Sequence, residues 1–168
     1  MNVLKVGILL ALALPGFVHA EQVAHAASPD GRIVVQLDLN GEGRLAYRVL
    51  HDGKPVIGDS RLGFILRNDR QLLRNLQMET QSSRSFDETW EQPWGERRFV
   101  RNRYNELRAE FVEKDRDRRR FSMVFRVFDD GVGFRYDVPK QPKLAEAQIV
   151  QELTEFAVAR PSTAWWIP

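Results

Sequence analysis

Apolar and polar residues alternate along several short stretches of this chain. Apolar side chains occupy every second position in residues 33–39, 45–49, 107–111, 121–127 and 132–138. A period of two is the pattern of a strand with one buried face, and turn residues such as Asn40–Gly43 and Asp52–Gly53 separate the stretches. We therefore predict a meander of short antiparallel strands, an all-β fold class and a sandwich architecture.

Four other segments give weaker signals. Residues 21–27 are small and polar, and we expect a flexible, frayed start there, before order begins at the Ser28–Gly31 turn. Apolar residues at 72, 73 and 76 allow a short helix in Asn68–Glu79 but suit an irregular edge equally well. The charged stretch Lys114–Arg120 indicates a solvated hairpin tip, and a last strand or two is expected between Ile149 and Val158.

The first twenty residues have the pattern of a secretory signal peptide. One charge, Lys5, precedes an apolar run from Val6 to Leu14, and Val18-His19-Ala20 places small residues where a signal peptidase cleaves. The run is shorter than the roughly twenty residues that a transmembrane helix needs, and no later stretch approaches that length. We therefore expect a secreted, periplasmic protein with no membrane span.

Composition narrows the chemistry that the chain could carry. Removing the leader takes away one base and no acid, so the net charge falls from +2 to +1, which does not favour nucleic acid as a partner. The sequence has no cysteine, so burial alone must stabilise the fold. His19 leaves with the leader, His25 lies in the frayed start and His51 sits at a turn. Cysteine-histidine and serine-histidine-aspartate catalysis and common zinc sites are thereby disfavoured.

The segment Asp129–Gly133 allows two interpretations. The first is a turn between two strands, because aspartate bonds nearby backbone amides and glycine relieves crowding. The second makes Asp129 and Asp130 an acid pair or metal ligands, although adjacent residues on an extended chain point to opposite faces. The turn is the favoured interpretation.

Residues 88–96, which we expect to form a loop, contain two tryptophans, Trp90 and Trp94, together with the carboxylates of Glu88 and Glu96. Sugars stack their apolar faces on aromatic rings while carboxylates accept hydroxyl hydrogen bonds, so Trp90, Trp94 and Glu96 are candidate substrate-binding residues. The alternative, which burial statistics favour, is that both tryptophans anchor a core. The arginines at 97, 98, 101 and 103 could suggest nucleic acid, but flanking glutamates favour a solvated or salt-bridged sheet face.

Six short motifs together resemble the amino-terminal domain of glycoside hydrolase family 97, a family of bacterial exo-acting alpha-glucosidases and alpha-galactosidases. The resemblance covers about residues 28–168. In chain order the motifs are DETW (Asp87–Trp90), PWGE (Pro93–Glu96), YNEL (Tyr104–Leu107), FRVFDDGVGFRY (Phe125–Tyr136), TEF (Thr154–Phe156) and TAWWIP (Thr163–Pro168).

The resemblance implies an antiparallel β-super-sandwich similar to the galactose-mutarotase fold, packed against a catalytic (β/α)8 barrel. The family's catalytic carboxylates lie on that barrel, so it implies no catalytic residue and no metal ligand in these 168 residues. Family enzymes hold a calcium ion through glutamates, one of which would follow the segment 163–168. We expect an incomplete sandwich, a barrel normally carboxy-terminal to it, an oligosaccharide substrate and no calcium in the fragment itself.

Two rival functions remain open. A free-standing carbohydrate-binding module would use Trp90 and Trp94 directly. A sugar mutarotase is suggested only by the shared fold, and it would need framework histidines that the chain lacks.

Overall fold

The computed structural model describes residues 20–67, 71–163 and 165, and in this part of the chain regular structure consists of strands without a helix. The predicted leader, residues 1–19, lies outside the described residues. The strands are β1 (Glu21–Ala27), β2 (Ile33–Leu39), β3 (Leu45–His51), β4 (Lys54–Arg61), β5 (Phe64–Leu66), β6 (Leu76–Glu91), β7 (Phe99–Glu113), β8 (Arg120–Val127), β9 (Val132–Asp137) and β10 (Ile149–Glu152).

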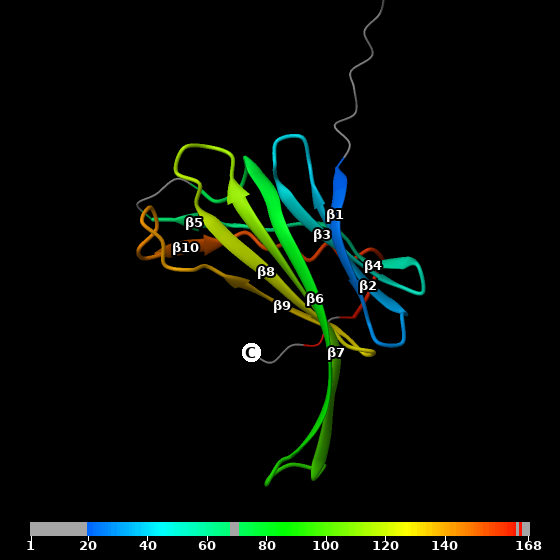
Figure 1. The fold of residues 1–168 in the computed structure, drawn as a ribbon. Coiled ribbons are helices and arrows are strands. Elements are labelled where there is room, and N and C mark those ends of the chain that lie inside the picture. The colour runs from blue at the N-terminus through cyan, green and yellow to red at the C-terminus, as the bar shows by residue number, and fades with distance from the viewer. Residues whose placement is uncertain (1–19, 68–70, 164, 166–168) are drawn as a thin grey trace, which may run out of the picture.

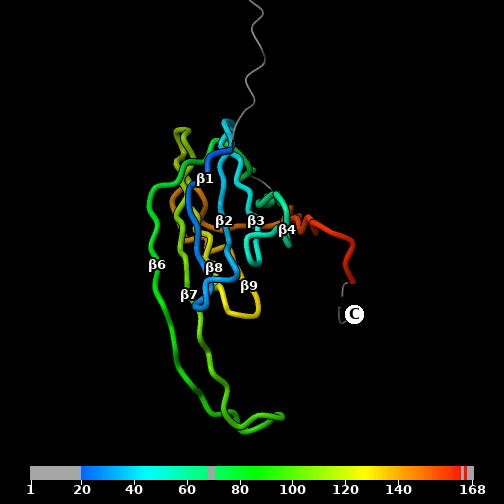
Figure 2. The backbone as a smooth tube through the Cα atoms, turned by 90° about the vertical axis from the view of Figure 1, so that its right-hand side faces the viewer, coloured from blue at the N-terminus to red at the C-terminus, as the bar shows by residue number. Residues whose placement is uncertain are grey.

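Two four-stranded antiparallel meanders face each other (Figures 1 and 2). One sheet has the order β1-β2-β3-β4 and the other β6-β7-β8-β9, while β5 and β10 form a separate pair. Neighbouring strands in each meander are consecutive in the chain. This order needs no crossover, since antiparallel neighbours can be joined by short turns. The predicted all-β antiparallel sandwich is confirmed.

The core lies between the two sheets and comes from the alternating positions that the sequence predicts. Burial of these apolar side chains is the main favourable term in folding, and period-two alternation directs every second residue inward. A smaller cluster of Phe64, Leu66, Leu72 and Leu144 lies beside β5. The central residues of the main core include Val35, Leu37, Leu107, Ala109, Phe111, Met123 and Phe125, each fully buried.

The expectation of a frayed start at residues 21–27 is wrong. This segment is β1, an edge strand that pairs antiparallel with β2 from Glu21–Leu39 to Ala27–Val34. Ala24 and Ala26 are buried inside the sandwich. Their small side chains give a weak hydrophobic signal in the sequence, so the strand depends on backbone pairing to β2.

Other weak segments are settled by tertiary contacts. Residues 72–75 are bends that lead into β6, so the helix alternative for 68–79 is wrong for its described part; residues 68–70 lie outside the described residues. The hairpin tip at 114–120 is present, but Arg119 at its end is buried and pairs with the buried Glu113. The last-strand prediction is confirmed by β10, which pairs with β5, and by a backbone bridge from Val158 to Ile57.

A long hairpin arm projects from the sandwich at the lower end of Figure 1. β8 pairs with β7 only from Asn105 onward, so the ends of β6 and β7 beyond that point pair only with each other. We call residues 86–104 the arm: Phe86–Glu91 of β6, a tip loop of residues 92–98, and Phe99–Tyr104 of β7. Figure 2 shows the arm extending past the end of the opposite sheet.

Candidate functional site

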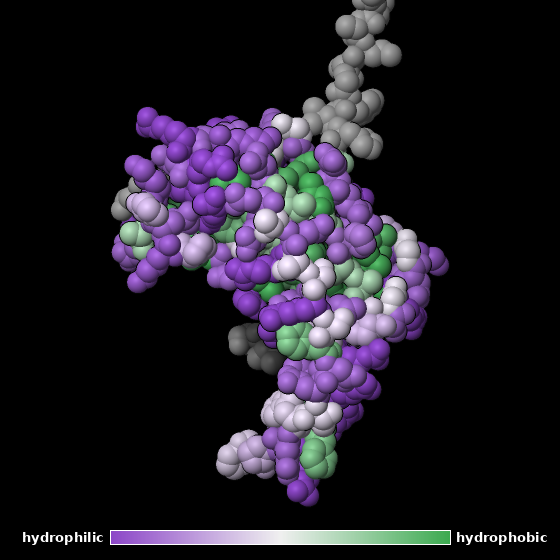
Figure 3. Space-filling view, in the orientation of Figure 1, coloured by the Kyte–Doolittle hydropathy of each residue, from purple (hydrophilic) through white to green (hydrophobic). Residues whose placement is uncertain are grey.

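The three candidate substrate-binding residues all lie on the arm. The loop expected at residues 88–96 is wrong for Trp90, which belongs to strand β6. Trp94 and Glu96 do lie in the tip loop. Their side chains are outside the hydrophobic core, with Trp90 48% exposed and Trp94 83% exposed. Core anchoring therefore does not explain either tryptophan in this structure. Figure 3 shows the arm as a mainly hydrophilic projection that carries isolated apolar side chains.

Hydrogen bonds from Gln92 close the tip loop. Its backbone N–H donates to the carbonyl of Arg98 over 2.9 Å, and its side-chain amide donates to the carbonyl of Arg97 over 2.7 Å. Gly95 has a φ of +109°, which a residue with a Cβ rarely adopts. The loop thus presents Trp94 and Glu96 to solvent on a turn with a defined path.

The arm has two chemically different faces, because successive strand residues point to opposite sides. On the face that continues the core side of β7, Asp87 accepts two hydrogen bonds from Arg101 at 2.6 and 2.8 Å, and Glu91 accepts one from Arg98 at 2.7 Å. The side-chain hydrogen bonds from Arg101 hold the pKa of Asp87 below its usual range. We call this the inner face, and its paired charges confirm the predicted salt-bridged sheet face.

The opposite, outer face carries aromatic residues and a neutral amide. The strand register places Glu88 opposite Asn102 and Trp90 opposite Val100. The side-chain amide of Asn102 donates to Glu88 Oε1 over 2.8 Å. The sequence analysis does not single out Glu88 and Asn102 as a pair. The two residues are fourteen positions apart in the chain, and the pairing of β6 with β7 brings them together.

A buried carboxylate fastens the root of the arm. Glu106 is only 4% exposed by its side chain and accepts hydrogen bonds of 2.8 Å from Arg84 Nε and from Arg126 Nε. Burial, the largest single influence, raises the pKa of Glu106, but the hydrogen bonds from Arg126 and Arg84 outweigh it and leave that pKa below its usual range. Three neighbouring strands are thereby joined through one side chain.

Aromatic rings lie against the two arginines that bind this carboxylate. Phe86 stacks on Tyr104 with ring centroids 4.8 Å apart. The guanidinium of Arg84 lies 4.6 Å from the Phe86 centroid and that of Arg126 lies 4.8 Å from the Tyr104 centroid. Cation–π contacts of this kind hold each arginine in place beside Glu106. The YNEL motif of the sequence, Tyr104–Leu107, therefore marks the root of the arm.

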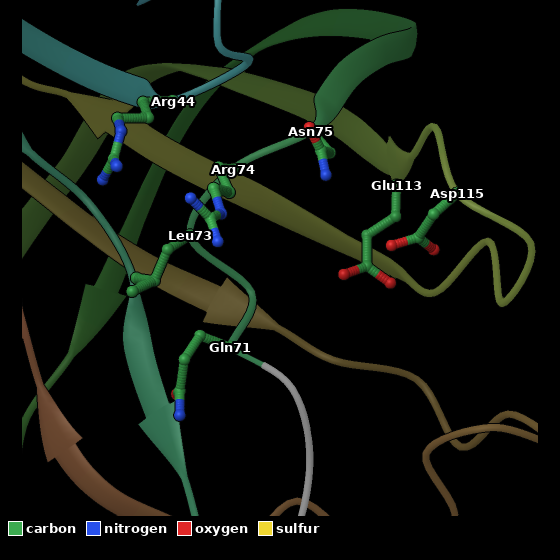
Figure 4. A pocket seen from close by; sticks show the side chains of 7 residues that line it. All are labelled: Arg44, Gln71, Leu73, Arg74, Asn75, Glu113 and Asp115. Atoms are coloured by element: carbon green, nitrogen blue, oxygen red, sulfur yellow. The ribbon is translucent and has the colours of Figure 1, made fainter.

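A polar cavity of about 390 Å³ lies at the other end of the sandwich (Figure 4). Arg44 and Arg74 lie on one side of it and Glu113 and Asp115 on the other. Arg44 is already paired with Glu42 over 2.6 Å. The remaining lining residues are Gln71, Leu73 and Asn75, so no aromatic ring is available there for stacking on a sugar.

The aspartates at 129 and 130 form a turn, as favoured from the sequence. The N–H of Phe128 donates to the carbonyl of Gly131 over 2.8 Å, which closes the connection between β8 and β9. Asp129 accepts a hydrogen bond from the backbone N–H of Asp30 over 2.8 Å and so ties this turn to the β1–β2 connection. The turn lies beside an apolar groove of about 450 Å³ lined in part by Tyr47 and Phe156.

Metal ligands do not gather in the described part of the chain. Within residues 20–67, 71–163 and 165, no group of three or more histidine, cysteine, aspartate or glutamate side chains could hold a metal ion. Among the same residues, no helix is long and apolar enough to span a membrane.

Comparison with known proteins matches nearly the same residues as the resemblance, which covers about residues 28–168. A family model described as glycosyl-hydrolase 97 N-terminal matches residues 26–168. A glycoside hydrolase family 97 enzyme from Pseudoalteromonas sp. strain K8, solved with acarbose and in variant form with panose, is 37% identical with a TM-score of 0.80. The superposition covers 86% of this chain and 22% of that enzyme.

Two further relatives agree with this match. A probable retaining alpha-galactosidase from Streptomyces bingchenggensis (strain BCW-1) is 31% identical over 139 residues, which are 83% of this chain and 20% of that protein. The crystal structure of a beta-arabinopyranosidase is 26% identical with a TM-score of 0.72, covering 80% of this chain and 21% of that chain. The chain thus spans about a fifth of the length of these relatives, and it belongs to the glycosyl-hydrolase 97 N-terminal family.

Proposed function

We propose that this chain is the carbohydrate-contacting, non-catalytic amino-terminal domain of an exported exo-acting alpha-glycosidase. The observation that carries the proposal is the family match over residues 26–168 of a sandwich that corresponds to only 22% of a solved relative. That relative was solved with acarbose and panose, which supports a sugar as the ligand class.

The described residues support an absence of hydrolytic activity in the chain alone. Glycoside hydrolysis needs two carboxyl groups on either side of the scissile bond, about 5 to 9.5 Å apart depending on stereochemistry. On the arm, Asp87 and Glu91 are each engaged by an arginine, and Glu88 is bonded to Asn102. In this proposal, the catalytic pair belongs to a barrel outside these 168 residues.

The experiment is a pair of measurements on the purified chain. Nitrophenyl alpha-glucoside and alpha-galactoside test hydrolysis, and calorimetric titration with panose and maltotriose tests binding. We expect no nitrophenol release and a measurable heat of sugar binding. Nitrophenol release that survives further purification would overturn the non-catalytic assignment, and no heat at millimolar sugar would overturn the carbohydrate-contacting one.

A free-standing carbohydrate-binding module is the second candidate, and the exposure of Trp90 and Trp94 favours it. Both candidates predict sugar binding. Adding a separately produced family 97 barrel distinguishes them, because only a domain of the enzyme would bind that barrel. Export to the periplasm is part of the proposal and rests on the leader pattern in residues 1–20. Cell fractionation of the expressing bacterium tests it.

A further inference from the structure

The outer face of the arm combines an aromatic ring with a fixed polar pair. Trp90 and Glu88 lie two residues apart on β6, so they share a face and are separated by about 6.5 Å along the strand. Asn102 lies directly opposite Glu88 on β7. We propose that Trp90, Glu88 and Asn102 form a binding site for one sugar ring of an oligosaccharide, with Trp90 as the stacking platform. This inference rests on the proposed function and names the residues that carry it.

The polar pair has the hydrogen-bonding capacity that a sugar diol requires. The bond from Asn102 Nδ2 to Glu88 Oε1 at 2.8 Å fixes both side chains relative to each other. Beyond this bond, the pair retains a carboxylate oxygen, an amide oxygen and an amide N–H. Neighbouring hydroxyl groups both donate and accept, so acceptors and a donor side by side can engage two of them at once.

The ring beside this pair is accessible. Trp90 is 48% exposed, so about half of its surface is covered by the arm and the rest is available to a ligand. Binding sites for small molecules commonly combine aromatic surface with a few placed polar groups. Val100, the cross-strand neighbour of Trp90, is partly buried and adds an apolar contact without a competing charge.

The inner face of the arm lacks this arrangement. Arg101 is paired with Asp87 and Arg98 with Glu91, so these side chains satisfy one another across or near the strands. A sugar placed there would have to compete with existing ion pairs, and the aromatic ring on that face, Phe99, already has the guanidinium of Arg98 5.3 Å from its centroid. The inner face therefore carries paired charges, whereas the outer face carries the exposed indole ring and the polar pair that a sugar site needs.

The site also has a rigid base. Phe86 lies two residues before Glu88 on the same face and stacks on Tyr104 at 4.8 Å, next to the Glu106 cluster. An isolated two-stranded ribbon is marginally stable in water, and this cluster fastens it to β8. Supporting contacts that fix the backbone are what hold binding residues in a productive geometry.

The tip residues are assigned no part in this site. Trp94 and Glu96 lie in the loop beyond the last paired positions, Glu91 and Phe99, and so outside the ladder that aligns the outer face. This makes them matched controls, because they place the same two residue types on the same arm. Of the three residues predicted from the sequence, the site keeps Trp90, whereas Glu88 and Asn102 take the place of Trp94 and Glu96.

Four single variants of the full chain test the inference by calorimetric titration with panose and maltotriose. We expect Trp90→Ala and Glu88→Ala to weaken binding at least tenfold, about 1.4 kcal/mol. We expect Trp94→Ala and Glu96→Ala to stay within about twofold of the parent chain. A shift of the Asn102 side-chain amide signal on adding sugar provides an independent spectroscopic readout. Circular dichroism melts of all four variants check that the sandwich remains folded.

The outcomes separate the inference from the proposed function. If the Trp94 and Glu96 variants lose binding while the Trp90 and Glu88 variants keep it, the outer-face site is overturned and carbohydrate binding stands. If the parent chain binds neither sugar, both fail together. If Trp90→Ala changes only the oligomeric state in sedimentation and leaves sugar binding intact, the outer face is a protein interface and the inference is overturned.

Discussion

Removing the charge of Glu106 should loosen the attachment of the arm without opening the core. The substitution Glu106→Gln keeps the shape of the side chain, but a glutamine has one acceptor oxygen where glutamate has two. Arg84 and Arg126 both donate to this carboxylate over 2.8 Å. In the variant one of them therefore faces an amide N–H₂ group and loses its acceptor.

The expected cost follows from the geometry. A hydrogen bond to a charged group contributes about 1.5 to 3 kcal/mol, and the variant loses one such bond and weakens the other. The side chains of Arg84 and Arg126 are 63% and 40% exposed, so water replaces part of the lost interaction. We expect the free energy of unfolding to fall by about 2 kcal/mol after this discount.

Urea unfolding followed by circular dichroism measures this change. With a slope of about 2 kcal/mol per molar urea, the midpoint should fall by about 1 M. The control is Asp87→Asn on the neighbouring strand β6, where Asp87 and its partner Arg101 are both about half exposed and the change should be smaller. An effect of Glu106→Gln no larger than that of Asp87→Asn would refute the buried-anchor argument.

The pH dependence provides a second check. The pKa of Glu106 is lowered from 4.5 in the folded chain, so the folded state binds fewer protons than the unfolded state as pH falls through this range. The stabilisation is therefore present above about pH 4.5 and is lost as pH falls through the folded pKa. The stability difference between the parent chain and Glu106→Gln should shrink in this acidic window and persist at neutral pH.

Three further predictions concern the sandwich. Phe125→Ala, at a fully buried position, should lower the free energy of unfolding by about 3 to 5 kcal/mol in urea titrations, and a loss below about 1 kcal/mol would contradict its place in the core. Burial raises the pKa of Tyr47 to about 12, so stability should fall as pH rises from 10 to about 12, and Tyr47→Phe should flatten that fall in alkaline melts. Gly43→Ala should lower the melting temperature more than Gly53→Ala. Both glycines have a positive φ, but of the two only Gly43 would place a Cβ against backbone, 2.5 Å from Leu76 N. Equal losses in the two variants would exclude that clash.

The exposure of the arm tryptophans shows how sequence signals compete. Statistics of burial favour the core for Trp90 and Trp94, whereas the structure places both on a projecting ribbon. The reason is that β8 pairs with β7 only as far as Asn105, so among the described residues no third strand pairs with the arm. Strand length relative to neighbouring strands is a non-local property, which a window of sequence does not contain.

By itself, the sequence determined the fold class, most of the core and, through its ordered motifs, the family. The alternation in residues 33–39 and 121–127 is sufficient for the fold class and the core, because a period of two identifies the side of each strand that is buried. Only the tertiary structure decided that residues 21–27 form an edge strand, that Glu106 is buried beneath two arginines, and that Glu88 meets Asn102. Each of these depends on which strands pair and in what register, and the energy of such pairing arises between residues far apart in the chain.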